Sequence, residues 1–291
     1  DEHFHAIFGA PFLGTLPFAP DLQPESEDSL SNPRKVTCKT GSTSEGERVR
    51  VRWIPFPSVS NAQDIEPWTQ DPGVDLEPIS DPKALTQTDL LILPGSKNTL
   101  ADLDWLHTSG FTSAIQRFAA QKGTIIGVCG GFQMLGQSLI DPDAHDGIGG
   151  VRTGLALLPT LTSFQAQKTV RQVTASFRGD TWMAYEIHMG TTRPTPTAPP
   201  IDPLFTCQMT GSEEHAEGFH RDNVLGTYLH GCFESPAFRQ HLCALARPDL
   251  AERTLVQTRS WRLAKDRIYD GMADLLAEHL DLGPILEHLS R

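Results

Sequence analysis

The 291-residue sequence lacks any apolar run of the roughly 20 residues that a membrane-spanning helix needs. Its N-terminus is acidic and lacks the apolar segment of a secretory signal. Basic residues are also few, with 24 Lys and Arg against 36 Asp and Glu, for a formal net charge of -12. Because nucleic-acid phosphates are bound by basic faces, nucleic acid is a disfavoured partner. We therefore expect a cytoplasmic protein without nucleic-acid or membrane partners.

Cysteine is scarce, and its pattern excludes two common uses. The five cysteines are an odd number and include no CxxC pair, so neither a disulfide framework nor a zinc site is expected. No pair of histidines has the i, i+4 spacing with a nearby carboxylate, so we predict no metal site. A phosphate-binding Gly-x4-Gly-Lys-Ser/Thr loop is also missing, because Gly95-Ser96-Lys97 lacks the upstream Gly and the following Ser/Thr.

Short apolar runs alternate with helical spacing in the first half of the chain. The predicted strands are residues 50–54, 89–93 and 124–128, and the predicted helices are residues 99–121 and 130–140. Strands that alternate with helices indicate an α/β protein with a parallel sheet covered on both faces.

The rest of the chain has other patterns. Residues 168–178 and 181–188 alternate like an antiparallel pair, and residues 223–228 predict one more strand. The tail from Arg253 has the spacing of an amphipathic helix. Residues 19–45 are rich in Pro, Ser, Asp, Glu and Gly, which predicts a linker.

Cys129 has the one sequence context in which a thiol is expected to be reactive. It follows a predicted buried strand and opens a helix, in the run Gly127-Val128-Cys129-Gly130-Gly131. Such a turn presents a nucleophile at the carboxyl end of a sheet, and its strained backbone needs small neighbours. The helix N-terminus favours a thiolate, and the N–H of Gly130 suits a tetrahedral oxyanion. A free cysteine is ordinarily a small buried residue, and we expect that role for Cys38, Cys207, Cys232 and Cys243.

A thiol nucleophile needs a base. His230 stands just past a predicted strand and before Gly231, where a sheet presents catalytic side chains. His188 is the second candidate, and the other histidines are expected at the surface or in loops. The residues alone leave the choice between His230 and His188 open.

Four segments together resemble the C-terminal glutamine amidotransferase domain of the cobyric acid synthase family. They are residues 93–99 with Asp102-Leu103, residues 127–136 continuing to Asp141-Pro142, residues 185–190, and residues 226–231. Ser60-Asn61 and the following Asp64 resemble the family's entry strand and loop. The loop at residues 94–99 and the Glu-Ile-His-Met-Gly segment are closer to cobyric acid synthase than to cobyrinate a,c-diamide synthase.

The resemblance implies a flavodoxin-like, three-layer α/β fold with a mixed, mostly parallel sheet. It implies Cys129 as the nucleophile, His230 as the base, and Gly130 with the Gly95 loop as the oxyanion region. Gln133 matches the segment that lines the glutamine pocket, although capping or packing would also suit it.

Ordinary class I triad enzymes place a Glu two residues after the catalytic His, and here that position is Cys232. The resemblance is therefore to the branch without the third triad member. A carboxylate normally orients the imidazole. Glu186 and Glu234 are the alternatives for this role.

The resemblance also implies a division of the chain. Residues 1–45 would be the end of an N-terminal ATP-dependent synthetase domain with a linker, residues 46–245 the amidotransferase domain, and residues 246–291 a helical extension. The chain starts at Asp1 rather than Met, and residues 11–17 and 27–30 resemble the last strand and exit of the synthetase half. We therefore expect a C-terminal fragment of a longer enzyme.

The implied activity is the release of ammonia from glutamine for cobalamin biosynthesis. The ammonia would amidate the b, d, e and g carboxylates of the corrinoid adenosylcobyrinic acid a,c-diamide. ATP and Mg would serve that ligase reaction in the synthetase half, and we expect no cofactor in this chain. Two other functions stay open: a catalytically silent binding or regulatory module, and a cysteine hydrolase of another substrate. The joint presence of Cys129 and His230 favours the amidotransferase, since a silent module needs neither.

Overall fold

The computed structural model describes residues 7, 9, 11–22, 24, 47–251 and 260–289. Cys38 and most of the predicted linker, residues 25–45, lie outside the described residues. The chain divides into two compact units, Asp1–Glu25 with Arg262–Arg291, and Ser26–Trp261. The division into a synthetase remnant, an amidotransferase domain and an extension, at residues 45 and 245, stays a prediction.

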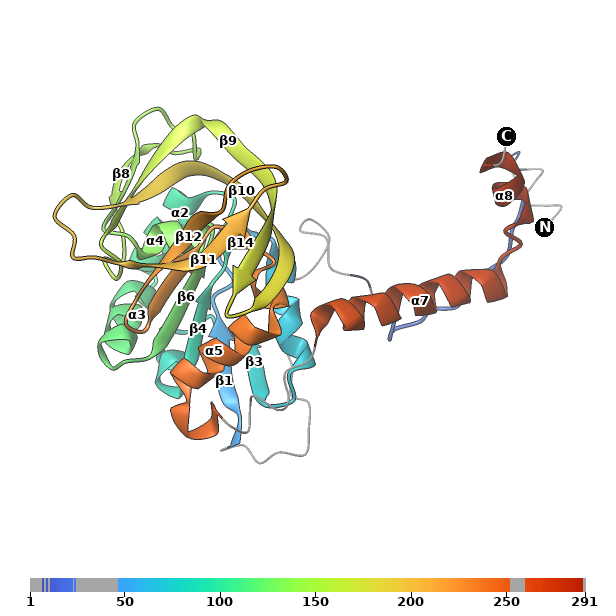
Figure 1. Cartoon of the computed structure of the whole chain (residues 1–291), viewed down its shortest axis with the longest axis horizontal. Coiled ribbons are helices and arrows are strands. Elements are labelled where there is room, and N and C mark those ends of the chain that lie inside the picture. The colour runs from blue at the N-terminus through green and yellow to red at the C-terminus, as the bar shows by residue number, and fades with distance from the viewer. Residues whose placement is uncertain are drawn as a thin grey trace. The chain divides into compact units, whose positions relative to one another are not determined.

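The larger unit is built on a mixed sheet (Figure 1). Its parallel strands, in spatial order, are β3 (Val74–Pro78), β1 (Val49–Trp53), β4 (Leu90–Leu93), β6 (Thr124–Val128) and β13 (Val224–Thr227). The parallel sheet expected from the sequence is thus confirmed. The register places Leu93 beside Gly127 and Thr227 beside Val128, so β4, β6 and β13 end at one edge. Ligands of open α/β sheets bind beyond this carboxyl edge.

Antiparallel strands extend the sheet beyond β13. In spatial order they are β12 (His215–Arg221), β11 (Asp202–Gln208), β9 (Thr160–Phe177), β10 (Asp180–Pro194) and β14 (Leu229–His230). The predicted hairpin is confirmed, with Phe177 paired to Asp180 next to its turn. Strands β7 (Ser138–Asp141) and β8 (Gly150–Thr153) pair beside β9, and β2 (Val59–Ser60) pairs with β5 (Gly95–Ser96).

Two predicted helices differ from the observed ones. The helix expected over residues 99–121 is two helices, α2 (Thr99–Thr108) and α3 (Phe111–Ala120), because Gly110 between them has a left-handed φ of 83°. The helix expected over residues 130–140 is the short α4 (Gly130–Leu135). Its last predicted residues instead form β7, because pairing with β8 and β9 outweighs local helix propensity.

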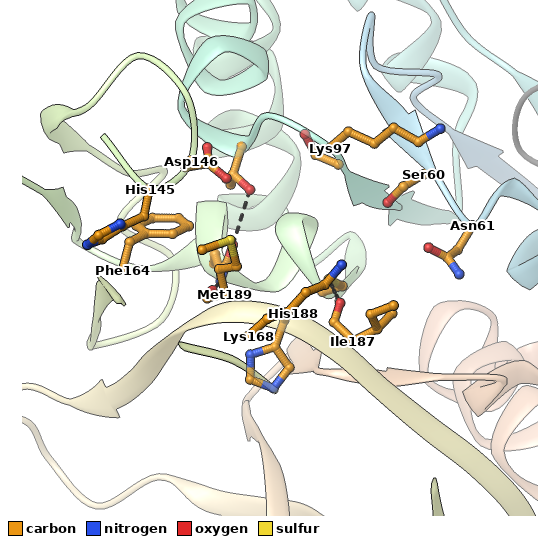
Figure 2. A pocket seen from close by; sticks show the side chains of 14 residues that line it. Ser60, Asn61, Lys97, His145, Asp146, Phe164, Lys168, Ile187, His188 and Met189 are labelled. Carbon is orange, nitrogen blue, oxygen red and sulfur yellow. Dashed lines mark hydrogen bonds between the residues drawn. The ribbon is translucent and has the colours of Figure 1, made fainter. Parts of the chain in front are cut away.

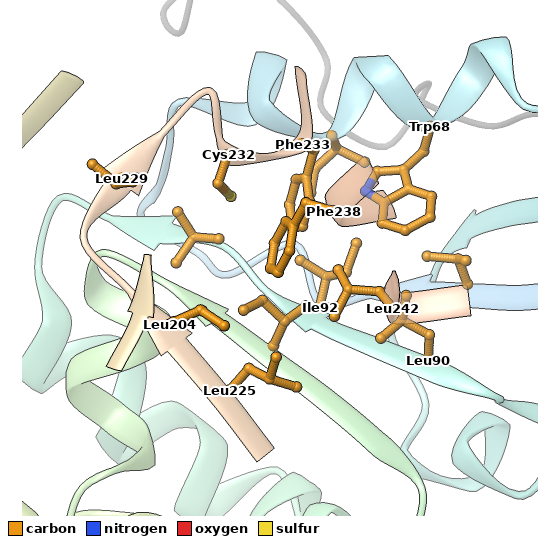
Figure 3. Packing of buried hydrophobic residues seen from close by; sticks show 14 of the residues in the cluster. Trp68, Leu90, Ile92, Leu204, Leu225, Leu229, Cys232, Phe233, Phe238 and Leu242 are labelled. Atoms are coloured by element: carbon orange, nitrogen blue, oxygen red, sulfur yellow. The ribbon is translucent and has the colours of Figure 1, made fainter. Parts of the chain in front are cut away.

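Helical elements cover both faces of the parallel strands. Successive residues of β4 point to opposite faces, so Leu90 and Ile92 join one buried cluster and Leu91 and Leu93 another. Helices α2, α3 and α4 cover the second face. The first is covered by α5 (Pro236–Ala246) and the 3-10 helices η3 (Ala62–Gln70) and η5 (Cys232–Glu234). Figure 3 shows that cluster, with aromatic side chains packed over Leu90 and Ile92. Two further 3-10 helices are η4 (Pro82–Gln87) and η6 (Pro248–Leu250).

The smaller unit combines the start and the end of the chain. Its helices are α7 (Trp261–His279), whose first residue is still counted in the larger unit, and α8 (Gly283–Leu289). In place of the last strand of the synthetase half, which residues 11–17 resemble, the described residues there make a single bridge, Gly14 to Leu280. Proline at positions 11 and 17 removes the N–H groups that a longer ladder needs. No helix of the described residues is long and apolar enough to cross a membrane.

Candidate active site

Cys129 occupies a strained turn between β6 and α4. Its φ of 51° and ψ of -109° are costly for a side chain with a Cβ, on the order of 1–3 kcal/mol. The turn is held because Cys129 N–H donates to Thr227 O at 2.8 Å and Gln133 N–H donates to Cys129 O at 3.1 Å. Such strain persists only when the surroundings dictate it, and it presents the thiol at the carboxyl edge of the sheet.

The glycines beside Cys129 permit two close approaches. A Cβ on Gly131 would lie 2.1 Å from the carbonyl oxygen of Leu93, so α4 packs directly on the end of β4. A Cβ on Gly130 would lie 2.9 Å from the backbone nitrogen of Ser96. The expectation that this turn needs small neighbours is therefore confirmed at both positions.

His230 is fully buried at the end of β14 and is held by a carboxylate. Its Nδ1 lies 2.6 Å from Oδ2 of Asp64, whose Oδ1 accepts the N–H of Gly231 at 2.9 Å. The ring also stacks on Tyr185, with 5.1 Å between centroids. Asp64 therefore fixes both the orientation of the imidazole and the backbone next to it. The Nδ1 atom bears the hydrogen in this arrangement, which directs Nε2 away from Asp64.

The charges around His230 favour its protonated form. Burial disfavours the charge, but the negative carboxylate of Asp64 and the neighbouring Cys129 outweigh burial and raise the pKa of His230 to about 10. The Nε2 atom is buried and has no hydrogen-bond partner among the described residues. A cationic imidazole next to a cysteine is the general environment of reactive thiols.

Asp64 is the residue that the sequence left without a role. Both alternatives for orienting the imidazole are wrong, because the partner of His230 Nδ1 is Asp64. Glu186 instead accepts two hydrogen bonds from Arg171, at 3.0 Å each. The backbone N–H of Glu234 donates a hydrogen bond to Gly231 O. The only sequence signal for Asp64 is its place after the Ser60-Asn61 entry loop, 166 positions before His230.

His188, the second candidate base, has both ring nitrogens engaged. Nδ1 lies 3.0 Å from Gly190 O and Nε2 lies 3.3 Å from Oε2 of Glu186. The ring also stacks on Tyr228 at 3.7 Å between centroids. Geometry thus favours His230 over His188 as a proton carrier.

Gln133 lines the site, and its amide makes three hydrogen bonds inside the protein. Its Oε1 accepts from the Thr99 hydroxyl at 3.2 Å, and its Nε2 donates to Met189 O at 2.8 Å and to the Tyr228 hydroxyl at 3.2 Å. The geometry agrees with the packing role that the sequence also allowed. The amide ties α4 to β10 and to the chain before His230.

Gly95 lies against the imidazole. A Cβ at Gly95 would be 3.4 Å from Cε1 of His230 and 2.8 Å from the hydroxyl oxygen of Ser60. The Gly95 loop and Gly130 therefore meet beside Cys129 and His230, as an oxyanion region requires. Their catalytic role stays a prediction.

A cavity of about 290 Å³ opens at Cys129. Figure 2 shows Asp146 on one wall and Ser60 and Asn61 on the other, with Ile187 and His188 below. Ile187 O accepts from the thiol of Cys129 at 3.6 Å. Among the described residues, no group of three or more His, Cys, Asp or Glu could hold a metal ion. The site thus combines a cysteine on a strained turn, an oriented imidazole and space for a small molecule.

Comparison with known proteins decides the family. A model of the CobB/CobQ-like glutamine amidotransferase domain matches residues 50–238. The chain belongs to this family. It therefore carries a glutamine amidotransferase domain, which confirms the enzyme class expected from the sequence.

Curated relatives and one solved structure agree with the family. A cobyric acid synthase of Leptothrix cholodnii is 35% identical over 305 residues, 99% of this chain and 55% of that protein. A cobyric acid synthase of Rhodococcus jostii is 36% identical over 284 residues, 97% of this chain and 54% of that protein. The chain thus spans about half the length of the curated relatives it matches. A crystal structure of a glutamine amidotransferase matches with a TM-score of 0.50 and 12% identity, covering 67% of this chain and 98% of that one, which supports the predicted three-layer α/β fold.

Proposed function

We propose that the chain hydrolyses glutamine at Cys129 and supplies the ammonia to an amide-forming reaction. The observation that carries the proposal is the contact of Asp64 with His230, next to a cysteine that lines a cavity. Asp64 holds the imidazole at 2.6 Å, and the imidazole interacts electrostatically with Cys129, which lies on a strained turn. This is the arrangement that activates a thiol nucleophile for acyl transfer.

In the first half-reaction, Cys129 and His230 react as a thiolate–imidazolium pair, in which the thiol proton has passed to Nε2, and the thiolate attacks the amide carbon of glutamine. The carbonyl electrons move to oxygen, which the N–H of Gly130 and the Gly95 loop stabilise. As the carbon–nitrogen bond breaks, Nε2–H of His230 gives its proton to the leaving nitrogen. Ammonia leaves, a glutamyl thioester remains on Cys129, and His230 becomes neutral.

In the second half-reaction, neutral His230 activates water. Nε2 takes a proton from the water as its oxygen attacks the thioester carbon, and the carbon–sulfur bond then breaks. Glutamate leaves, and the thiolate and imidazolium are restored. Asp64 remains charged throughout and keeps Nε2 directed at the reacting atoms.

The ammonia acceptor is part of the same proposal. The relatives with about twice this length are named cobyric acid synthases. We propose that the ammonia amidates the b, d, e and g carboxylates of adenosylcobyrinic acid a,c-diamide, in the cytoplasm. ATP, Mg and the corrinoid serve a synthetase half, and this chain supplies only ammonia. Specific binding of ATP by residues 1–291, measured by calorimetry, would contradict this division of labour.

Labelling with the glutamine analogue 6-diazo-5-oxo-norleucine tests the glutaminase proposal. We expect mass spectrometry to find the adduct on Cys129, and Cys129→Ala to abolish both labelling and glutamate release. Cys207→Ala is the matched control, because this thiol is buried in β11. Glutamate release should be measured with and without the synthetase half, since the domain can depend on its partner. Unlabelled Cys129, with glutamate release unchanged in Cys129→Ala, would refute the proposal. Glutamine binding without turnover would indicate the silent module.

A further inference from the structure

We infer that Asp146 binds the α-ammonium group of the substrate, so that the cavity selects amides of zwitterionic α-amino acids over amides without that positive charge. The inference rests on the proposed glutaminase function and adds a specificity determinant to it. Its basis is the position of Asp146, its hydrogen bonds and the charges around it.

Asp146 belongs to the loop between β7 and β8 and lines the same cavity as Cys129. Figure 2 shows it across the cavity from Ser60 and Asn61. An amino-acid amide has its reacting carbon at one end and its ammonium group at the other. With the amide carbon at Cys129, a carboxylate that lines the same cavity can receive the ammonium end.

The carboxylate of Asp146 is held in place by the protein. Its Oδ2 accepts the N–H of Leu100, in the first turn of α2, at 2.8 Å. The loop itself is fixed by Asp141, which accepts the N–H of His145 at 2.9 Å and that of Asp146 at 2.8 Å. A preorganised side chain loses little conformational freedom on binding, which is what a specificity contact needs.

The local charges favour a bound cation. Burial raises the pKa of Asp146 to about 6, and nearby Asp141 adds to the rise, against hydrogen bonds from Leu100 and Thr99. When a carboxylate is costly to ionise, a cation placed against it strongly stabilises its ionised form.

The other charged groups of the cavity leave the role of a cation beside Asp146 to a ligand. His145 lies 3.7 Å from Asp143, and His188 is bonded to Glu186 and Gly190. Lys97 and Lys168 line the cavity, and the exposed side chain of Lys168 suits the α-carboxylate of a zwitterion. Their positive charge would also repel an ammonium group that did not reach Asp146.

Asp146→Asn tests the inference, because the amide oxygen can still accept from Leu100 while the charge is lost. The substrates are L-glutamine and glutaramate, which has the same amide and a carboxylate but no ammonium group. We expect the KM for glutamine to rise about 30-fold or more with kcat changed only a few-fold, and kcat/KM for glutaramate to stay the same or rise. Asp143→Asn, in the same loop and largely exposed, is the matched control and should behave like the wild type.

Two further measurements separate the outcomes. In the wild type, the KM for glutamine should rise as the pH falls below about 6, and Asp146→Asn should lose this dependence. Asp146→Glu should keep the preference for glutamine, provided that iodoacetamide still alkylates its Cys129. An unchanged glutamine-to-glutaramate ratio in Asp146→Asn, or a lost preference in an alkylatable Asp146→Glu, would overturn the inference. A wild type without glutaminase activity or analogue labelling would instead overturn the proposed function.

Discussion

Replacing Asp64 with Asn removes one negative charge beside His230 and changes little else in size. The contact is short, 2.6 Å from Nδ1 to Oδ2, and both groups are buried. Together with Cys129, Asp64 raises the pKa of His230 from 6.5 to about 10, against burial. At about 1.4 kcal/mol for each pKa unit, the site favours the imidazolium by about 5 kcal/mol.

Burial lowers the pKa of His230, and the negative charge of Asp64 opposes this effect. Without that charge the pKa of His230 should fall steeply. The amide of Asn can also bond either tautomer of the ring, so Nε2 is no longer reliably the proton donor. The same carboxylate-to-amide change in the triad of a serine protease lowers kcat about 10⁴-fold. We expect Asp64→Asn to lower kcat for glutamate release about 10² to 10⁴-fold, with the KM for glutamine changed much less.

Two assays check this prediction. One is kcat for glutamate release, and the other is the rate at which iodoacetamide alkylates Cys129 across a pH series. In Asp64→Asn, alkylation should slow, because the imidazole beside Cys129 is no longer held by a carboxylate. Glu234→Gln is the comparison variant and should leave both readouts within about threefold. If Asp64→Asn keeps the wild-type kcat and alkylation profile, or if Glu234→Gln loses them, the assignment of Asp64 is wrong.

Two further predictions concern stability. Gly131→Ala should lower the free energy of unfolding by about 3 kcal/mol or more, because its Cβ would lie 2.1 Å from Leu93 O. Gly179→Ala is the control, because its Cβ meets nothing within 4 Å, and it should lower the free energy of unfolding by only about 1 kcal/mol for its positive φ. If thermal melting shows equal losses of stability in the two variants, the clash at Gly131 is refuted. Burial raises the pKa of Glu217 from 4.5 to about 7, so the wild type should lose about 3 kcal/mol relative to Glu217→Gln as the pH rises from 4.5 to 7. Urea unfolding of both proteins across that pH range checks the sign of this change. Free energies of unfolding that vary with pH in parallel for the two proteins would contradict it.

Sequence by itself determined the features that depend on near neighbours. The turn at Cys129 was predictable, because a buried strand, flanking glycines and a following helix are all written within a few residues. The β9–β10 hairpin was predictable for the same reason, since alternation and a Gly-containing turn are local patterns. Prediction was weaker where long-range pairing competes with propensity, as in the residues after Leu135 that join β7 instead of extending α4.

Only the tertiary structure decided how the site is completed. Asp64 lies on a 3-10 helix with no periodic pattern, and packing of that helix beside β14 brings it to His230. The same packing engages both nitrogens of His188 and gives the amide of Gln133 three hydrogen bonds inside the protein. It also brings Asp146 into the cavity of Cys129. The physical reason is that hydrogen-bond partners distant in sequence are chosen by how layers pack, and no local propensity encodes that choice.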